Sequence, residues 1–241
     1  MLVIAGLCCA FPLSSAAQTL RLVTGNSAPF ATPQRDGFFD LLVAEMFRRI
    51  GVQAEVHTHE SSARALVSAN QGDDHGLVAR VRGLEAEYPN LVIIPEKVFD
   101  NDFVACTLGA EFTTPGWQAL ESRHVAFIRG WRVFETRLSG HRELTRARDA
   151  AQLFELLQRQ RVEVALYERW QALWHARQRG IPIRVLEPPL AREEMFAYLH
   201  RRHAGLAPRA AAALAAMKAD GGYRRIFDST LGSLQQAPGR R

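Results

Sequence analysis

Strand-like and helix-like segments alternate along this chain, and the alternation limits its fold more than any other feature. Leu20–Val23 is a short apolar run. Between Phe39 and Ile50 the apolar residues then recur every three or four positions, as on one face of a helix, and Val52–Val56 alternates like a strand. Strands separated by helices of this length form parallel sheets, because the helix provides the crossover connection. The pattern therefore predicts an α/β protein whose mostly parallel sheets carry flanking helices.

The alternation begins again in the second half of the chain. His124–Ile128 is predicted to be a strand, Asp149–Gln160 a helix and Val162–Leu166 a further strand. A helix over Glu168–Arg179 follows, and Gly180 ends it. No flexible linker separates the two series. Two directly joined α/β units predict two lobes with a cleft between them, which is where small ligands commonly bind.

Composition and charge exclude several classes of protein. Hydrophobic residues make up 47% of the 241 residues and charged residues 23%, which excludes a mostly disordered chain. The net charge is +5, and all the basic residues except Lys97 and Lys218 are arginines. These arginines are spread along the chain without a basic run, so we expect no nucleic-acid partner.

The N-terminal residues match a secretory signal peptide. An apolar run over residues 2–13 is followed by the small residues Ser14–Ala17, which predicts cleavage after Ala17 and removal of residues 1–17. The run is too short to span a bilayer, and the alternative interpretation is a first buried strand or helix. The mature chain would keep Cys106 as its one cysteine, so no internal disulfide is predicted. We expect an exported, periplasmic protein.

Five segments occur in an order that resembles a known family. They are LRLVTGNSAPF (20–30), GFFDLLVAEMFRRIGVQAEV (37–56), GDDHGLVAR (72–80), RQRVEVALYERW (159–170) and KADGGYRRIF (218–227). In this order and spacing they resemble bacterial periplasmic solute-binding proteins of the polar-amino-acid type, the family 3 extracellular components of ABC importers. The resemblance implies the two-lobed, type II periplasmic-binding-protein-like fold. It places residues 18–103 and 192–241 in lobe 1 and residues 104–191 in lobe 2.

The resemblance also implies a function. A monomer would capture a small polar, carboxylate-bearing, amino-acid-like ligand and deliver it to an ABC permease in the inner membrane. The same fold serves periplasmic sensors with a membrane signalling partner, and a few lyases such as the cyclohexadienyl dehydratases, so both remain alternatives. We predict no enzymatic activity and no cofactor. No metal site is predicted either, because the histidines have no complete pattern of ligand spacing.

Three charged residues occur where predicted strands end. Arg80 and Arg129 each follow a strand directly, and Glu168 lies two residues past another. In open α/β sheets the ligand sits beyond the carboxyl ends of the strands, and guanidinium groups bind carboxylates through paired hydrogen bonds. In the family that the chain resembles, the position of Glu168 holds the ligand's amino group. We therefore predict that Arg80 and Arg129 clamp a zwitterion with one further acidic group. The alternative is that these arginines are solvated or paired with a neighbouring carboxylate, such as Glu85 for Arg80.

Further ligand-binding candidates are Trp131, Asn26, Ser27, Phe30 and Arg82. Trp131 is predicted to be either an aromatic wall of the site or a hydrophobic plug between the lobe and its helix. Asn26 and Ser27 are polar residues of the first loop, and Phe30 is expected to pack beneath the site. The chain lacks the arginine that usually binds the carboxylate in the resembled family. Either Arg80 or Arg82 takes this role, or the ligand is not an α-amino acid.

Overall fold

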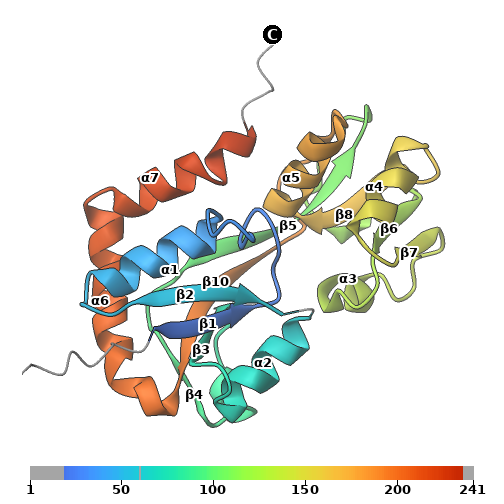
Figure 1. Ribbon diagram of the computed structural model, residues 1–241. Helices are drawn as coiled ribbons and strands as arrows, with labels where there is room; N and C mark the ends of the chain where they lie inside the picture. The colour runs from blue at the N-terminus through green and yellow to red at the C-terminus, as the bar shows by residue number, and fades with distance from the viewer. Residues whose placement is uncertain (1–18, 60, 236–241) are drawn as a thin grey trace, which may run out of the picture.

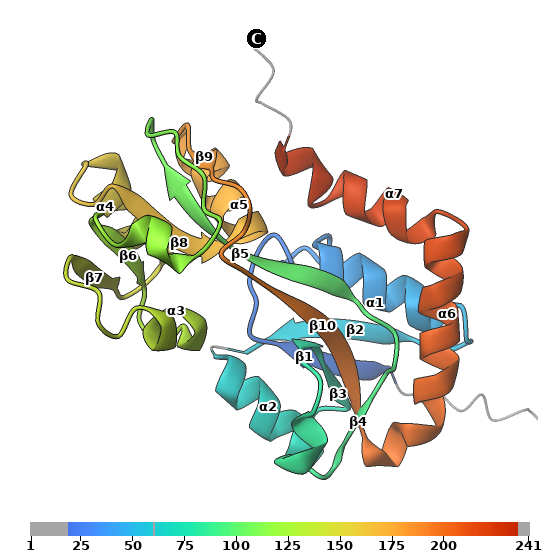
Figure 2. The ribbon, with the colours of Figure 1, turned by 180° about the vertical axis from the view of Figure 1, so that it is seen from behind.

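The computed structural model describes residues 19–59 and 61–235, and the predicted signal peptide lies outside this range. Its strands follow the order β2-β1-β3-β10-β5-β8-β6-β7, with β4 beside β10 and β9 beside β5. Two α/β bodies lie at the ends of this order, and the long strands β5 and β10 run between them (Figure 1). The view from behind shows the same two connections (Figure 2).

Lobe 1 contains a parallel core of three strands with helices on both faces. The strands are β1 (Leu20–Thr24), β2 (Ala54–Thr58) and β3 (Gly76–Arg80), and the helices are α1 (Phe38–Arg48), α2 (Ser62–Gln71), α6 (Ala207–Ala219) and α7 (Gly222–Ser229). Adjacent strand residues point to opposite faces, so Leu22 and Val78 pack with α1 and α6 whereas Val23 and Leu77 pack with α2. Burial on both faces explains the continuous apolar runs of these strands.

Lobe 2 repeats this plan. Its parallel strands are β6 (Val125–Ile128), β7 (Leu144–Ala147) and β8 (Val164–Glu168), and its helices are α3 (Arg132–Arg137), α4 (Ala150–Gln158) and α5 (Arg169–Arg179). Phe154 and Tyr167 belong to the apolar cluster on the α4 and α5 face, and Phe127 and Phe134 to the cluster on the other face. The helix predicted at 149–160 is α4, for which Asp149 is the N-cap. The strand β7 was not predicted, because its sequence Leu-Thr-Arg-Ala has no apolar alternation.

The two lobes are joined by antiparallel strands, which are β5 (Phe99–Thr107) and β10 (Ala191–His200), with the short strands β4 (Leu91–Ile93) and β9 (Arg184–Val185) at their sides. Along this pair Ala191 lies opposite Phe103 and Met195 opposite Phe99. The first half of β10 is Ala-Arg-Glu-Glu, which has no strand signature, and its place in the sheet comes from pairing with β5.

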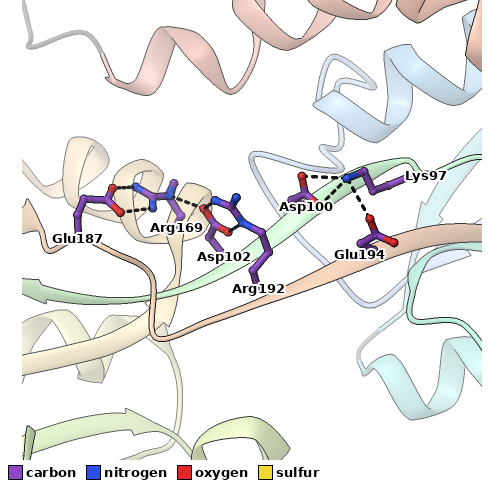
Figure 3. A network of polar contacts seen from close by, with 7 residues as sticks. All are labelled: Lys97, Asp100, Asp102, Arg169, Glu187, Arg192 and Glu194. Carbon is purple, nitrogen blue, oxygen red and sulfur yellow. Dashed lines mark hydrogen bonds and ion pairs between the residues drawn. The ribbon is translucent and has the colours of Figure 1, made fainter. Parts of the chain in front are cut away.

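A network of charges holds the crossing strands (Figure 3). The buried carboxylate of Asp102 on β5 accepts a hydrogen bond from Nε of Arg169 at 3.1 Å and from Nη2 of Arg192 at 2.8 Å. Arg169 also donates to Glu187, at 2.6 Å. Since Arg169 is the first residue of α5 and Arg192 lies on β10, Asp102 links lobe 2 to both connections between the lobes. These ion pairs and hydrogen bonds compensate for the cost of removing the Asp102 side chain from water.

Candidate ligand-binding site

A cavity of about 280 Å³ lies where strands of both lobes end. It is lined by residues at or after the ends of β1, β2, β3, β6 and β8 and by residues of the crossing strands: Asn26, Ser62, Ala79, Arg80, Asn101, Phe103, Gly130, Trp131, Arg132, Val133, Glu168, Gln171 and Met195. This is the edge where ligands of open α/β sheets bind. Of the eight residues nominated from the sequence, the cavity brings together Arg80, Glu168, Trp131 and Asn26.

Arg80 is the last residue of β3, and its guanidinium has no counter-ion among the residues that the structure describes. Its guanidinium donates to two neutral acceptors, the carbonyl oxygens of Ala79 and Ser62, both at 2.8 Å. Within residues 19–59 and 61–235 no carboxylate pairs with it, and Glu85 does not. Burial lowers the pKa of Arg80 to about 10, so the group stays charged at neutral pH. An uncompensated guanidinium facing a cavity is suited to bind an anionic group.

The backbone before Arg80 is strained. Ala79 has φ of 65°, in the left-handed region that residues other than glycine rarely adopt, and it is buried at the cavity wall. Such a conformation costs on the order of 1–3 kcal/mol and persists only where surrounding structure fixes it. The register of β10 against β3 also shifts between Phe196 and Tyr198, beside this residue. The strained turn at Ala79 positions Arg80 at the cavity.

Glu168 supplies the opposite kind of group from lobe 2. It ends β8 and is the N-cap of α5, where its Oε2 accepts a hydrogen bond from the backbone N–H of Gln171 at 2.8 Å. Its other oxygen, Oε1, is buried and has no partner among the described residues, and the whole residue is 2% exposed. Burial raises the pKa of Glu168 to about 8. An unsatisfied carboxyl oxygen at the cavity is suited to accept from a ligand cation.

Asn101 was not predicted, and it adds a second unsatisfied acceptor. It lies on β5, is 7% exposed, and its Oδ1 has no partner in the described part of the chain. Phe103, two residues further along the strand, lies directly opposite Glu168, so Asn101 and Phe103 share the face that borders the cavity. The sequence signal was the spacing Phe99, Asn101, Phe103, which puts a polar residue among apolar ones on one face of a strand.

Trp131 packs within lobe 2 and also borders the cavity. It follows Gly130, whose φ of 88° turns the chain at the end of β6, and it caps α3. Its ring lies 4.8 Å from that of Tyr167 and stacks on Phe134 at 5.9 Å, and it also lines the cavity. The residue therefore packs into lobe 2 and forms part of the cavity wall.

The second arginine at the cavity is Arg132, rather than Arg129. Arg129 is exposed and is absent from the lining, and its backbone N–H donates to the carbonyl of Ala147 at 2.9 Å. Arg132 begins α3 and lines the cavity. Its guanidinium has no hydrogen bond or ion pair with any residue that the structure describes. The cavity lining therefore contains an arginine from each lobe, Arg80 and Arg132, but not the predicted Arg129.

The other nominated residues lie outside the cavity lining. Ser27 is exposed, and Phe30 is fully buried, stacked on Phe39 at 4.7 Å in the core of lobe 1. Arg82 is exposed and its guanidinium lies 4.0 Å above the ring of Phe196. Arg80, and not Arg82, therefore reaches the cavity.

A larger hollow of about 670 Å³ lies within lobe 2, between the segment 117–122 and the end of α3. It is bordered by one lobe only and contains no buried unsatisfied polar atom, so we do not assign it to the ligand. In the described part of the chain, no three histidine, cysteine or acidic side chains group as metal ligands would. None of the helices described is both long and apolar enough to cross a membrane.

Solved structures share this architecture. The ligand-binding core of GluR0 from Nostoc punctiforme, in complex with L-glutamate, is 15% identical, with a TM-score of 0.70 over 88% of this chain and 98% of that one. An ancestral arginine-binding protein bound to glutamine is also 15% identical, with a TM-score of 0.68 over 89% and 98% of the two chains. A histidine kinase sensor domain with similarity to periplasmic binding proteins has 15% identity and a TM-score of 0.70, over 89% of this chain and 96% of its own.

At the level of sequence, no protein-family model and no curated protein matches the chain. The structural likeness extends over nearly the whole length of each neighbour, and these neighbours are mostly amino-acid-binding proteins. The chain has the two-lobed, type II periplasmic-binding-protein-like α/β fold that its sequence predicts.

Proposed function

We propose that this protein binds a small amino-acid-like zwitterion in the cavity between its lobes. The observation that carries the proposal is that two groups without partners among the described residues line the same cavity: the guanidinium of Arg80 in lobe 1, which has no counter-ion, and the buried Oε1 of Glu168 in lobe 2. A ligand carboxylate satisfies the guanidinium, and a ligand ammonium satisfies Glu168 and the nearby Oδ1 of Asn101. Both groups are costly while the cavity is empty, so the ligand supplies what the fold leaves unpaired.

We infer that this protein delivers the bound solute to an ABC permease. It would be exported to the periplasm and act there as a monomer. Its lobe 1 would comprise residues 18–103 and 192–241, and its lobe 2 residues 104–191. Support comes from the order of the family-like segments, from the apolar N-terminal run and from neighbours that are substrate-binding proteins of amino acid ABC transporters. Adjacent genes for a permease and an ATPase would favour this role, whereas an adjacent sensor kinase gene would favour signalling.

A lyase is the second candidate, because such an enzyme needs an acid or base that titrates near neutral pH in the cleft. Glu168 meets this requirement, since burial raises its pKa to about 8. The cavity lining contains no histidine and no second carboxyl group within the described residues, so binding without chemistry remains the proposal. Incubation with prephenate or arogenate distinguishes the two, because only a lyase yields an aromatic product.

A thermal-shift screen tests the ligand class. We expect proteinogenic amino acids to include at least one that raises the Tm, and its analogue without the amino group to raise it far less. At about a hundredfold excess over the Kd, binding adds roughly 2.7 kcal/mol of stability. An equal shift with the des-amino analogue would contradict the role of Glu168, and a shift only with sugars would contradict the proposal as a whole.

Closure of the lobes gives an independent prediction. The cavity takes its lining from both lobes, so a ligand that contacts both favours the closed arrangement. Small-angle scattering is expected to show a smaller radius of gyration with saturating ligand than without it. Identical profiles in the two conditions would show that the lobes do not close on the ligand.

A further inference from the structure

We propose that the ligand is an acidic amino acid, or a close analogue with one acidic group beyond the α-carboxylate, and that Arg132 is the residue that selects it. This inference rests on the proposed function and names its substrate class. It comes from the charges of the cavity and from Arg132, which has no partner among the residues that the structure describes.

The charged side chains that line the cavity do not balance one another. They are Arg80 and Arg132 from opposite lobes and Glu168 from lobe 2. When a ligand ammonium binds, Glu168 is held in its ionised form, and the lining then carries one net positive charge. An amino acid with a neutral side chain has no net charge and leaves this excess in place. A second acidic group on the ligand removes it, which matters because closure takes these charges out of water.

Arg132 is placed to make this contact. Arg80 is fixed by two carbonyl oxygens at the end of β3, in the lobe opposite Glu168, and it is suited to the α-carboxylate. Arg132 lies on α3, directly after Trp131, and its exposed guanidinium has no partner among the described residues. The side chain is therefore free to meet an acidic group at the far end of the ligand as the lobes close. Paired hydrogen bonds from a guanidinium favour a carboxylate over the amide of the same shape.

Calorimetric titration with matched ligands tests the assignment. L-glutamate and L-aspartate are compared with L-glutamine and L-asparagine, which have the same lengths but neutral side chains. For wild type we expect the better acidic ligand to bind roughly ten- to hundredfold more tightly than its amide. Arg132→Gln is expected to remove this preference, mainly through weaker binding of the acid. Arg137→Gln, at the other end of α3 and outside the cavity lining, is the control and is expected to keep the preference.

Three results would overturn the inference, and they differ in what they say about the site. Equal binding of acid and amide by wild type would leave a zwitterion site without acidic selectivity. Loss of the preference in Arg129→Gln but not in Arg132→Gln would assign selectivity to the residue outside the cavity lining. If none of the four amino acids binds the wild-type protein, this inference is wrong. The proposed function is also wrong if the thermal-shift screen finds no amino acid that binds. Circular dichroism and Tm confirm that each variant is folded.

Discussion

Replacing Arg80 with methionine is expected to lower ligand affinity by one and a half to three and a half orders of magnitude. A buried ligand carboxylate that loses its guanidinium partner stays desolvated and unpaired, which costs roughly 2–5 kcal/mol. About 1.4 kcal/mol corresponds to each tenfold change in Kd. Titration calorimetry measures the loss directly. Arg80→Lys should recover only part of the affinity, because an ammonium cannot reproduce paired donors.

The fold itself should tolerate this change. Methionine loses the hydrogen bonds to the carbonyls of Ala79 and Ser62, but it also removes a desolvated charge that has no counter-ion within residues 19–59 and 61–235. The stability of the ligand-free protein is therefore expected to change by no more than about 1 kcal/mol. Arg48→Met, on the exposed side of α1, is the control and should leave the Kd unchanged. A larger loss of affinity in Arg82→Met than in Arg80→Met would show that the wrong arginine had been assigned.

Glu168→Gln is expected to have opposite effects on stability and on binding. In the folded protein burial raises the pKa of Glu168 to about 8, against 4.5 for an ordinary glutamate. The folded state therefore keeps a proton that the unfolded chain releases, and the stability this provides is complete below pH 4.5 and is lost as the pH rises to about 8. Glutamine does not titrate, and its Oε1 can still accept from the N–H of Gln171. The variant should gain about 3 kcal/mol over wild type at pH 7, at about 1.4 kcal/mol per pH unit above 4.5.

Urea unfolding at several pH values measures this difference. We expect the advantage of Glu168→Gln to be small near pH 5 and to grow towards pH 8. Ligand binding should also depend on pH, because a ligand ammonium binds the ionised carboxylate. Wild-type affinity should rise by nearly tenfold per pH unit up to about pH 8. The Glu168→Gln variant should bind weakly at every pH. An advantage that does not change with pH would show that Glu168 is not the titrating group.

Both predictions describe a site that is unfavourable when empty. Around one cavity lie a guanidinium and two acceptor oxygens that have no ionic or hydrogen-bond partner of opposite kind in the described part of the chain, except for the two carbonyls bound by Arg80, and a residue at positive φ. Proteins retain such features where binding requires them, at the expense of stability elsewhere in the fold. The ligand is therefore expected to stabilise this protein strongly, and removal of either charged group to weaken that effect.

The sequence alone determined the local elements and the part of the site that depends on them. The apolar periodicity of residues 39–50 predicts the helix α1. Asp149 is the N-cap of α4 and Gly180 the C-cap of α5, which are the positions that an aspartate and a glycine favour at helix ends. Arg80 and Glu168 were found because a strand and its carboxyl end can be read from a short apolar run, and parallel strands present those ends at one edge. Each of these inferences uses residues that are near one another in the chain.

The tertiary structure decided everything that depends on contacts between distant segments. The charged first half of β10 becomes a strand only because β5 pairs with it, and Asn101 becomes a site residue only because that pairing places its face against the cavity. Arg129 and Arg132 flank the turn at Gly130, whose φ is 88°, and the tertiary structure places only Arg132 in the lining of the cavity. Periodicity reports which side of an element is buried, whereas the composition of a cavity depends on how several elements pack together, and no local pattern contains that information.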